Sequence, residues 1–190
     1  MLERYLIIGL GNPGIRYRRT RHNTGFMIIE RLGKDSDVRF VKKRGLCEQA
    51  ETTIAGRRVI LAKPLTYMNN SGGAVAELVQ WFKIPLERLL IVVDDIDMPL
   101  GRLRLRPGGG SGGHKGLASI IQYLGTEEFA RLRTGIGNEE IKRDVVKSVL
   151  SPFRSEERQE LESIIAKARD AVICFIREGI DKAMNLYNPK

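Results

Sequence analysis

Two histidines are present in this chain of 190 residues, and the surroundings of His22 make it the stronger candidate for a catalytic residue. His22 lies in a polar loop soon after the first apolar segment, beside Asn23 and a short distance after Asn12. An imidazole titrates near neutral pH and suits a general base. An asparagine amide can donate a hydrogen bond to a developing oxyanion. On these residues alone, a surface histidine without a chemical role stays open as the alternative.

No serine or cysteine stands in a pattern that fits a covalent nucleophile. Ser111 lies in GGSGG, which matches the nucleophile elbow G-x-S-x-G, but His114 follows it too closely in sequence to act as its base. Cys47 and Cys174 are far apart and form no C-x-x-C pair. That argues against a disulfide framework or a zinc site, and it favours a reducing, cytoplasmic location. Water is therefore the expected attacking group.

Three acidic residues, Asp94, Asp95 and Asp97, follow the apolar run Leu89–Val93, which reads as a central strand. They could hold a divalent metal, but no ligand spacing supports a defined site, so no metal or other cofactor is expected. A carboxylate at a strand end can instead fix the tautomer of an imidazole and stabilise the imidazolium that forms in catalysis.

Two glycine-rich loops match nucleotide-binding patterns only in part. GLGNPG fits the dinucleotide fingerprint, but its continuation, IRYRRTRHN, is basic and polar, so a rigid turn that holds Asn12 is the simpler interpretation. PGGGSGGHKG is not a P-loop, although a glycine-rich loop that leads into a helix offers free N–H donors to a phosphate. A loop without a ligand stays open as the alternative for this second segment.

The charge of the chain favours an anionic partner, because the net charge is +9 and the pI about 9.8. Every second residue of Arg102–Arg106 is an arginine, so these arginines share one face of an expected strand. Arg131 and Arg133 begin another strand. Guanidinium groups fork onto phosphate oxygens, which favours a phosphate-binding track. A solvated edge strand kept soluble by its charge is the alternative. Further arginines surround His22, namely Arg16, Arg18, Arg19 and Arg21.

Hydrophobic periodicity predicts a single α/β domain over residues 1–190, with a mixed β-sheet flanked by helices. The expected strands are Tyr5–Gly9, Val38–Ala50, Arg57–Ala62, Leu89–Val93, Gly101–Arg106 and Leu132–Ile136, the second and third forming a hairpin. The expected helices are Thr24–Leu32, Gly73–Phe82, Leu117–Leu124 and a long one capped by Ser155 and ended by Gly179. The N-terminus does not read as a signal peptide, and no apolar run is long enough to span a bilayer.

Taken in order, the motifs resemble the bacterial peptidyl-tRNA hydrolase family. They are GLGNPG, the segment from Tyr17 to Phe26 with its TRHN, KPLTYMNNSG, DDIDMPLG, GGGSGGHKG, FARLRTGIG and the terminal NLYN. The resemblance runs from end to end, and the ordered set is specific although each motif alone is weak. It implies a fold of the peptidyl-tRNA hydrolase-like, phosphorylase/hydrolase-like type. It also implies cleavage of the ester between a peptide and the 3′ ribose of tRNA by a monomeric, metal-free, cytoplasmic enzyme.

The resemblance also implies roles for individual residues. His22 falls at the base that activates water and Asp94 at its orienting carboxylate, while Asn12 and Asn69 fall at amides that hold the substrate and stabilise the intermediate. Tyr17 and Met68 look like walls of the cleft. Further candidates for contacts with substrate or tRNA are Asn23, His114, Lys115, Arg104, Arg106 and Arg133.

One position departs from the family pattern, which usually reads G-G-H-N-G where this chain has Gly112-Gly113-His114-Lys115-Gly116. An asparagine amide both donates and accepts hydrogen bonds, whereas the ammonium of Lys115 only donates and adds a charge. A protein of the same fold that binds RNA without hydrolysis is the second functional hypothesis. Such a binder need not keep His22, Asp94, Asn12 and Asn69 together.

Overall fold

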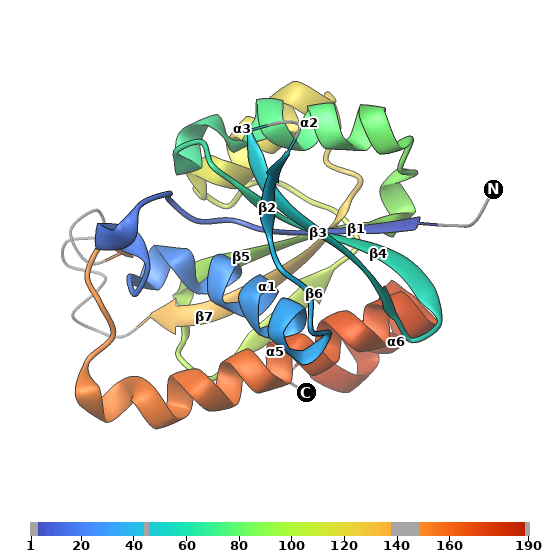
Figure 1. Cartoon of the computed structure of the whole chain (residues 1–190). Coiled ribbons are helices and arrows are strands. Elements are labelled where there is room, and N and C mark those ends of the chain that lie inside the picture. The colour runs from blue at the N-terminus through green and yellow to red at the C-terminus, as the bar shows by residue number, and fades with distance from the viewer. Residues whose placement is uncertain (1–3, 44–45, 138–148, 189–190) are drawn as a thin grey trace.

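The computed structural model describes residues 4–43, 46–137 and 149–188, and its strands form one seven-stranded sheet (Figure 1). Across the sheet the order is β2-β3-β4-β1-β5-β7-β6. The strands are β1 (Arg4–Gly9), β2 (Val41–Lys43), β3 (Cys47–Ile54), β4 (Arg57–Pro64), β5 (Leu89–Pro99), β6 (Leu103–Arg106) and β7 (Ala130–Gly137). The four central strands are parallel, and β2, β3 and β6 pair antiparallel with their neighbours. The predicted mixed α/β sheet is confirmed.

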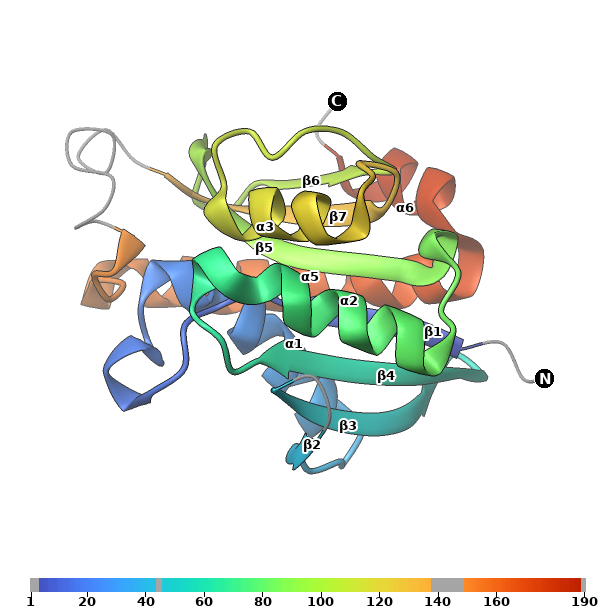
Figure 2. The same cartoon turned by 90° about the horizontal axis from the view of Figure 1, so that it is seen from above.

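Helices cover both faces of this sheet. One face carries α2 (Ser71–Phe82) and α3 (Lys115–Leu124), and the other carries α1 (Thr24–Asp35), α5 (Arg158–Glu178) and α6 (Ile180–Tyr187) (Figures 1 and 2). Successive residues of β1 enter opposite layers: Ile7 packs in the core under α1 and α5, whereas Leu6 and Ile8 pack under α2 and α3. Parallel strands buried on both faces read as continuous apolar runs, as Leu89–Val93 does.

Two glycines let α1 begin directly against the carboxyl ends of β1 and β5. A Cβ atom on Gly9 would lie 2.2 Å from the carbonyl oxygen of Gly25, and one on Gly25 would lie 2.5 Å from those of Leu10 and Val92. This close approach holds the short 3₁₀ turn Arg21–Asn23, which precedes α1, next to β5. His22 is thereby brought to the carboxyl edge of the parallel strands, where open α/β sheets keep their sites.

Most predicted elements are confirmed, but one segment predicted as a single strand contains two strands. Within the segment predicted as Val38–Ala50, β2 and β3 pair antiparallel, with Val41 opposite Gln49. The predicted hairpin lies between β3 and β4, where Ile54 pairs with Arg57 around Ala55-Gly56. Both turn residues have positive φ, 50° and 74°, as a two-residue turn of the primed type requires.

Several element boundaries differ from the prediction by one to three residues, and three differences are larger or bear on the site. β5 does not end at Val93 but continues to Pro99, because its acidic residues stay paired with β7, as Asp94 does with Thr134. Ser155 does not cap the long helix: its hydroxyl donates to Glu156, and the chain enters α5 through a 3₁₀ turn capped at Arg154. After Gly179, whose φ is 85°, the unpredicted helix α6 follows. Within the described ranges, no helix has both the length and the apolar character that a membrane crossing requires.

Candidate active site

A cleft of about 470 Å³ opens at the carboxyl ends of the parallel strands. These strand ends lie at the left of the sheet in Figure 1. It brings together most of the residues predicted from the sequence. The predicted residues in its lining are Asn12, Tyr17, His22, Met68, Asn69, Asp94, His114, Lys115 and Arg133. Asn23, Arg104 and Arg106 are not in the lining.

The contact between His22 and Asp94 organises the cleft. His22 Nδ1 lies 2.8 Å from Asp94 Oδ1 and 2.9 Å from Asp94 Oδ2. An ionised carboxylate only accepts hydrogen bonds, so Nδ1 carries the proton and donates it. The neutral imidazole then has an unprotonated Nε2, which is the atom that a general base needs. The continuation of β5 beyond Val93 makes this possible, because it holds the Asp94 side chain at a fixed place in the sheet.

His114 completes a three-residue cluster around Asp94. Its Nδ1 accepts a hydrogen bond of 3.2 Å from the backbone N–H of Leu117 and so caps α3. That bond fixes the tautomer with the proton on Nε2, which lies 3.1 Å from Asp94 Oδ1. The centroids of the His22 and His114 rings lie 5.3 Å apart. Because both histidines contact Asp94, this carboxylate connects the start of α3 to His22.

Asp94 stays ionised in this setting. Its side chain is 2% exposed, and burial by itself would raise the pKa of the carboxyl group. The electrostatic interaction with His22 and the hydrogen bonds from both histidines outweigh burial and hold the pKa of Asp94 well below its usual range. An acid limb in the pH dependence of activity therefore belongs to a group other than Asp94.

Asn12 is held in one orientation by the backbone around it. Its Oδ1 accepts a 2.9 Å hydrogen bond from the backbone N–H of Met68, which leaves the Nδ2 amide as the side-chain donor of this lining residue. Asn23 lies behind it: the side-chain amide of Asn23 binds the main-chain N–H and carbonyl of Asn12, both at 2.9 Å. Asn23 thus supports the loop of Asn12 and does not line the cleft.

The walls of the cleft come from two loops. Tyr17 meets Tyr67 edge to face, with ring centroids 6.5 Å apart, and the neighbouring Met68 is buried. Asn69 and Lys115 are exposed at the rim, and the Lys115 ammonium has no ion-pair partner among the described residues.

Sequence reasoning missed Tyr67 and the pair Val149 and Leu150 as lining residues. Tyr67 was available as the neighbour of Met68 in LTYMNNSG. Val149 and Leu150 carry no local signal, because their place depends on how a distant part of the chain folds back.

The arginines that the sequence groups together lie in different environments. Arg104 and Arg106 are exposed on β6, as predicted. Arg133 lines the cleft but donates to Asp95 at 3.2 Å and to the carbonyl of Ser111 at 2.7 Å. Arg131 is only 1% exposed, and Arg21 is buried in an ion pair with Glu157. Neither buried arginine is available to a phosphate.

A metal centre built from the three aspartates is not supported, because Asp95 is occupied by Arg133 and by the backbone N–H of Asp97. A different trio, His22, Asp94 and His114, has possible ligand atoms within 4.8 Å of one another. As they stand, both histidines use a ring N–H on Asp94, and a metal ion would have to displace both of these protons. The three side chains therefore fit a hydrogen-bonded cluster, in which both histidines donate to Asp94, better than a metal site.

The fold and the cleft together define an α/β protein whose cleft holds a histidine bound to a buried carboxylate, and its described lining residues include no serine or cysteine. Comparison with known proteins gives the family. The family model for peptidyl-tRNA hydrolase matches residues 6–190. The chain belongs to the peptidyl-tRNA hydrolase family.

Relatives and solved structures agree with this assignment. The chain is 50% identical to the peptidyl-tRNA hydrolase of Chloroflexus aggregans, covering 97% of this chain and 99% of that one. It is 48% identical to that of Aquifex aeolicus, covering 96% and 95%. A crystal structure of peptidyl-tRNA hydrolase from Acinetobacter baumannii superposes with a TM-score of 0.90 at 36% identity, covering 98% of this chain and 96% of that one.

Proposed function

We propose that this chain is a peptidyl-tRNA hydrolase, which cleaves the ester between the peptide and the 3′ ribose of tRNA and so recycles tRNA from prematurely released peptidyl-tRNA. Family membership and full-length relatives support the activity. The observation that carries the mechanism is the 2.8 Å contact between His22 Nδ1 and Asp94, which leaves His22 Nε2 free to accept a proton in the cleft.

In the proposed mechanism His22 Nε2 takes a proton from water as the water oxygen attacks the ester carbonyl carbon. The resulting imidazolium is stabilised by the Asp94 carboxylate. Asn12 Nδ2 is placed to donate a hydrogen bond to the oxyanion, since its Oδ1 is held by the Met68 N–H. The intermediate collapses when the ester C–O bond breaks and His22 returns the proton to the 3′ oxygen of the ribose.

The remaining predicted residues have supporting roles in this proposal. Tyr17, Met68, Asn69 and Lys115 contact the substrate end, and the exposed arginines of β6 contact tRNA phosphates. All described strands belong to one sheet, which supports a single catalytic domain over residues 1–190. We further propose that the chain acts as a monomer in the cytoplasm, where its tRNA substrate is found.

The substitution His22→Ala tests this function on an N-blocked aminoacyl-tRNA. Losing a general base lowers kcat by roughly 10²–10⁴-fold. The dissociation constant for deacylated tRNA, measured in parallel, is expected to stay close to that of the wild type. Arg58→Ala, which changes an exposed residue at the far end of the sheet, is the control for an unrelated surface change.

Normal turnover by His22→Ala would contradict the mechanism. A wild-type protein that binds tRNA tightly and cleaves no ester would instead favour an RNA-binding protein of the same fold.

A further inference from the structure

The turn Ile15–Arg19 presents arginines beside the cleft that the proposed mechanism does not use. We call this segment the arginine turn. Gly14, with φ at 107°, starts it, and the 3₁₀ turn Ile15–Tyr17 forms its first half. Arg16, Arg18 and Arg19 are all exposed, and none of them has an ion-pair partner among the described residues.

The arginine turn is tied directly to the cleft wall. The Arg16 guanidinium lies over the ring of Tyr17, 4.6 Å from its centroid, and Tyr17 lines the cleft. Arg18 lines a second hollow of about 310 Å³, which shares Asn12 with the cleft. The cations of the turn therefore adjoin the place where the ester would be cleaved.

Nearby acidic groups form no ion pair with these cations. Glu30 and Glu48 line the same hollow as Arg18, but both carboxylates bind the Lys63 ammonium, at 2.7 Å and 2.9 Å. Lys63 is buried, and the group as a whole keeps one negative charge, which is smaller than the charge of the three exposed arginines. Arg18 keeps its charge for an external anion.

The arginine turn is also held in place before any ligand binds. The backbone N–H and the hydroxyl of Thr20 both donate to the carbonyl of Tyr17, at 2.9 Å and 2.8 Å. The next residue, Arg21, is anchored by the Ser151 carbonyl and by Glu157. A fixed turn loses little conformational freedom on binding, which favours a binding role.

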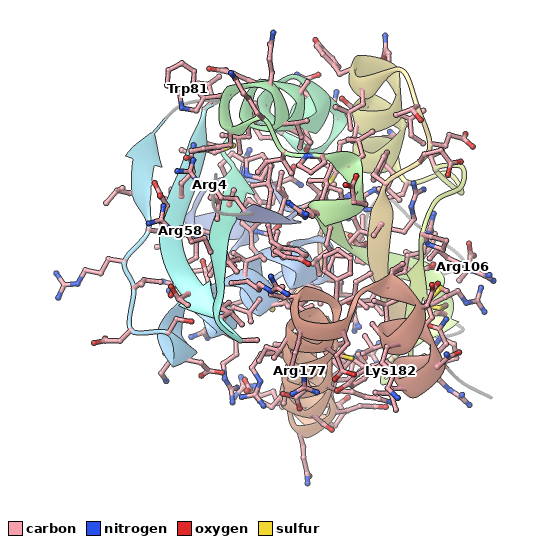
Figure 3. The ribbon with its side chains drawn as sticks, turned by 90° about the vertical axis from the view of Figure 1, so that its right-hand side faces the viewer. Arg4, Arg58, Trp81, Arg106, Arg177 and Lys182 are labelled. Carbon is pink, nitrogen blue, oxygen red and sulfur yellow. The ribbon has the colours of Figure 1, made fainter. Side chains whose placement is uncertain are left out.

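We infer that the arginine turn binds phosphodiester groups of the unpaired 3′ end of the RNA substrate, through Arg16 and Arg18. The inference rests on the proposed function. Only nucleotides next to the ester can reach a turn this close to the cleft, and in tRNA these are single-stranded. The exposed arginines of β6 lie progressively farther from the cleft, and Figure 3 shows Arg106 at the opposite end of the molecule. They are therefore better placed to bind the base-paired part of the tRNA than its single-stranded end.

Binding of a deacylated single-stranded hexanucleotide that ends in CCA tests this inference, by fluorescence anisotropy over a series of salt concentrations. Each phosphate contact on a single strand contributes about 0.7 to the slope of log K against log salt. Arg16→Gln combined with Arg18→Gln should therefore lower the slope by about 1.4. This corresponds to binding about 25-fold weaker at 0.1 M salt when affinities converge at 1 M.

The matched control is the double variant Arg58→Gln and Lys182→Gln. It removes the same charge from exposed positions at the opposite end of the molecule, which Figure 3 shows. The inference is supported if the control keeps the wild-type slope while the turn variant loses about 1.4. It is overturned if the turn variant binds the hexanucleotide like the control, or if it weakens only for an RNA duplex.

These results are separable from a failure of the proposed function. If the wild-type protein does not cleave N-blocked aminoacyl-tRNA, the proposed function is wrong, whatever the hexanucleotide binding shows. If the wild-type protein cleaves this substrate but the turn variant binds the hexanucleotide as tightly as the wild type, only the proposed role of the arginine turn is wrong.

Discussion

The arginines of β6 and those of β7 lie opposite each other but differ in their exposure to solvent. Arg104 is paired with Arg133 across the two strands, and Arg106 with Arg131. Directly opposite residues of antiparallel strands point to the same face, so the sequence pattern treats them as one basic surface. In the structure the two β6 arginines are exposed, whereas Arg131 is 1% exposed and Arg133 is largely covered.

The cause of this difference is the glycine-rich loop between β6 and α3. The Arg131 guanidinium donates to the carbonyls of Gly109, Gly110, Glu127 and Phe129, and it lies 4.3 Å from the centroid of the Phe129 ring. Burial in turn lowers the pKa of Arg131. The carbonyl oxygens of Gly109 and Gly110 thus face an internal cation, so this part of the loop covers β7 and is not a phosphate cradle.

The largest effect is expected from Arg131→Met, which removes the internal donor. The carbonyl of the buried Phe129 and three partly covered carbonyls would lose this donor, and an unsatisfied buried group costs about 1–3 kcal/mol. The free energy of unfolding should fall by about 2–4 kcal/mol, measured by urea denaturation. The salt dependence of tRNA binding should not change, because Arg131 does not reach the surface. If the Arg131→Met protein is as stable as the wild type and its tRNA binding depends less on salt, the distinction between buried arginines in β7 and exposed arginines in β6 is wrong.

An intermediate effect is expected from Arg133→Gln, since Arg133 is both partly covered and in the cleft. Its contacts with Asp95 and with the carbonyls of Ser111 and Gly110 are lost, which should lower the unfolding free energy by about 1–2 kcal/mol. The same Ser111 carbonyl accepts a 3.1 Å hydrogen bond from the backbone N–H of His114. We therefore expect kcat to fall as well, because the His114 contact with Asp94 loosens.

The control for Arg133→Gln is the double variant with Asp95→Asn, in which no buried carboxylate is left without its cation. It should regain part of the lost stability. Equal stability of the single and double variants would show that the Asp95 pair contributes nothing, and Arg133 would then belong with the exposed arginines of β6.

The sequence was sufficient for the fold class, which depends on local patterns, and for most of the cleft, which the family resemblance supplied. Apolar runs set the parallel strands. Asn12 and His22 follow β1 and Asp94 lies in the last part of β5, and these ends of the strands meet at one edge of the sheet. Burial was not predictable in the same way. Arg131 and Arg106 have the same type and the same alternation, and only the path of the glycine-rich loop separates them. Helix α6 was missed because Gly179, a valid stop signal, is followed at once by another helix.

Two details of the site also depend on tertiary structure. The continuation of β5 through its acidic residues needs β7 as a partner, and a carboxylate-rich segment alone does not suggest a strand. The dual use of His114, as the cap of α3 and as a donor to Asp94, joins residues that are distant in sequence. A motif can name His114 as a site residue but cannot fix the tautomer, which requires the Leu117 N–H.

The smallest effect on stability is expected from Arg106→Ala, the cross-strand partner of the buried Arg131. An exposed side chain on an edge strand contributes little, so the free energy of unfolding, measured by urea denaturation, should stay within about 0.5 kcal/mol of the wild type. Its effect should appear instead in tRNA binding, weakened to a similar extent for different tRNAs, with the salt slope lowered by about one. Binding titrations at several salt concentrations measure this. An unchanged slope would remove Arg106 from the phosphate contacts, and the separation between a structural β7 and an RNA-binding β6 would then rest on Arg104 alone.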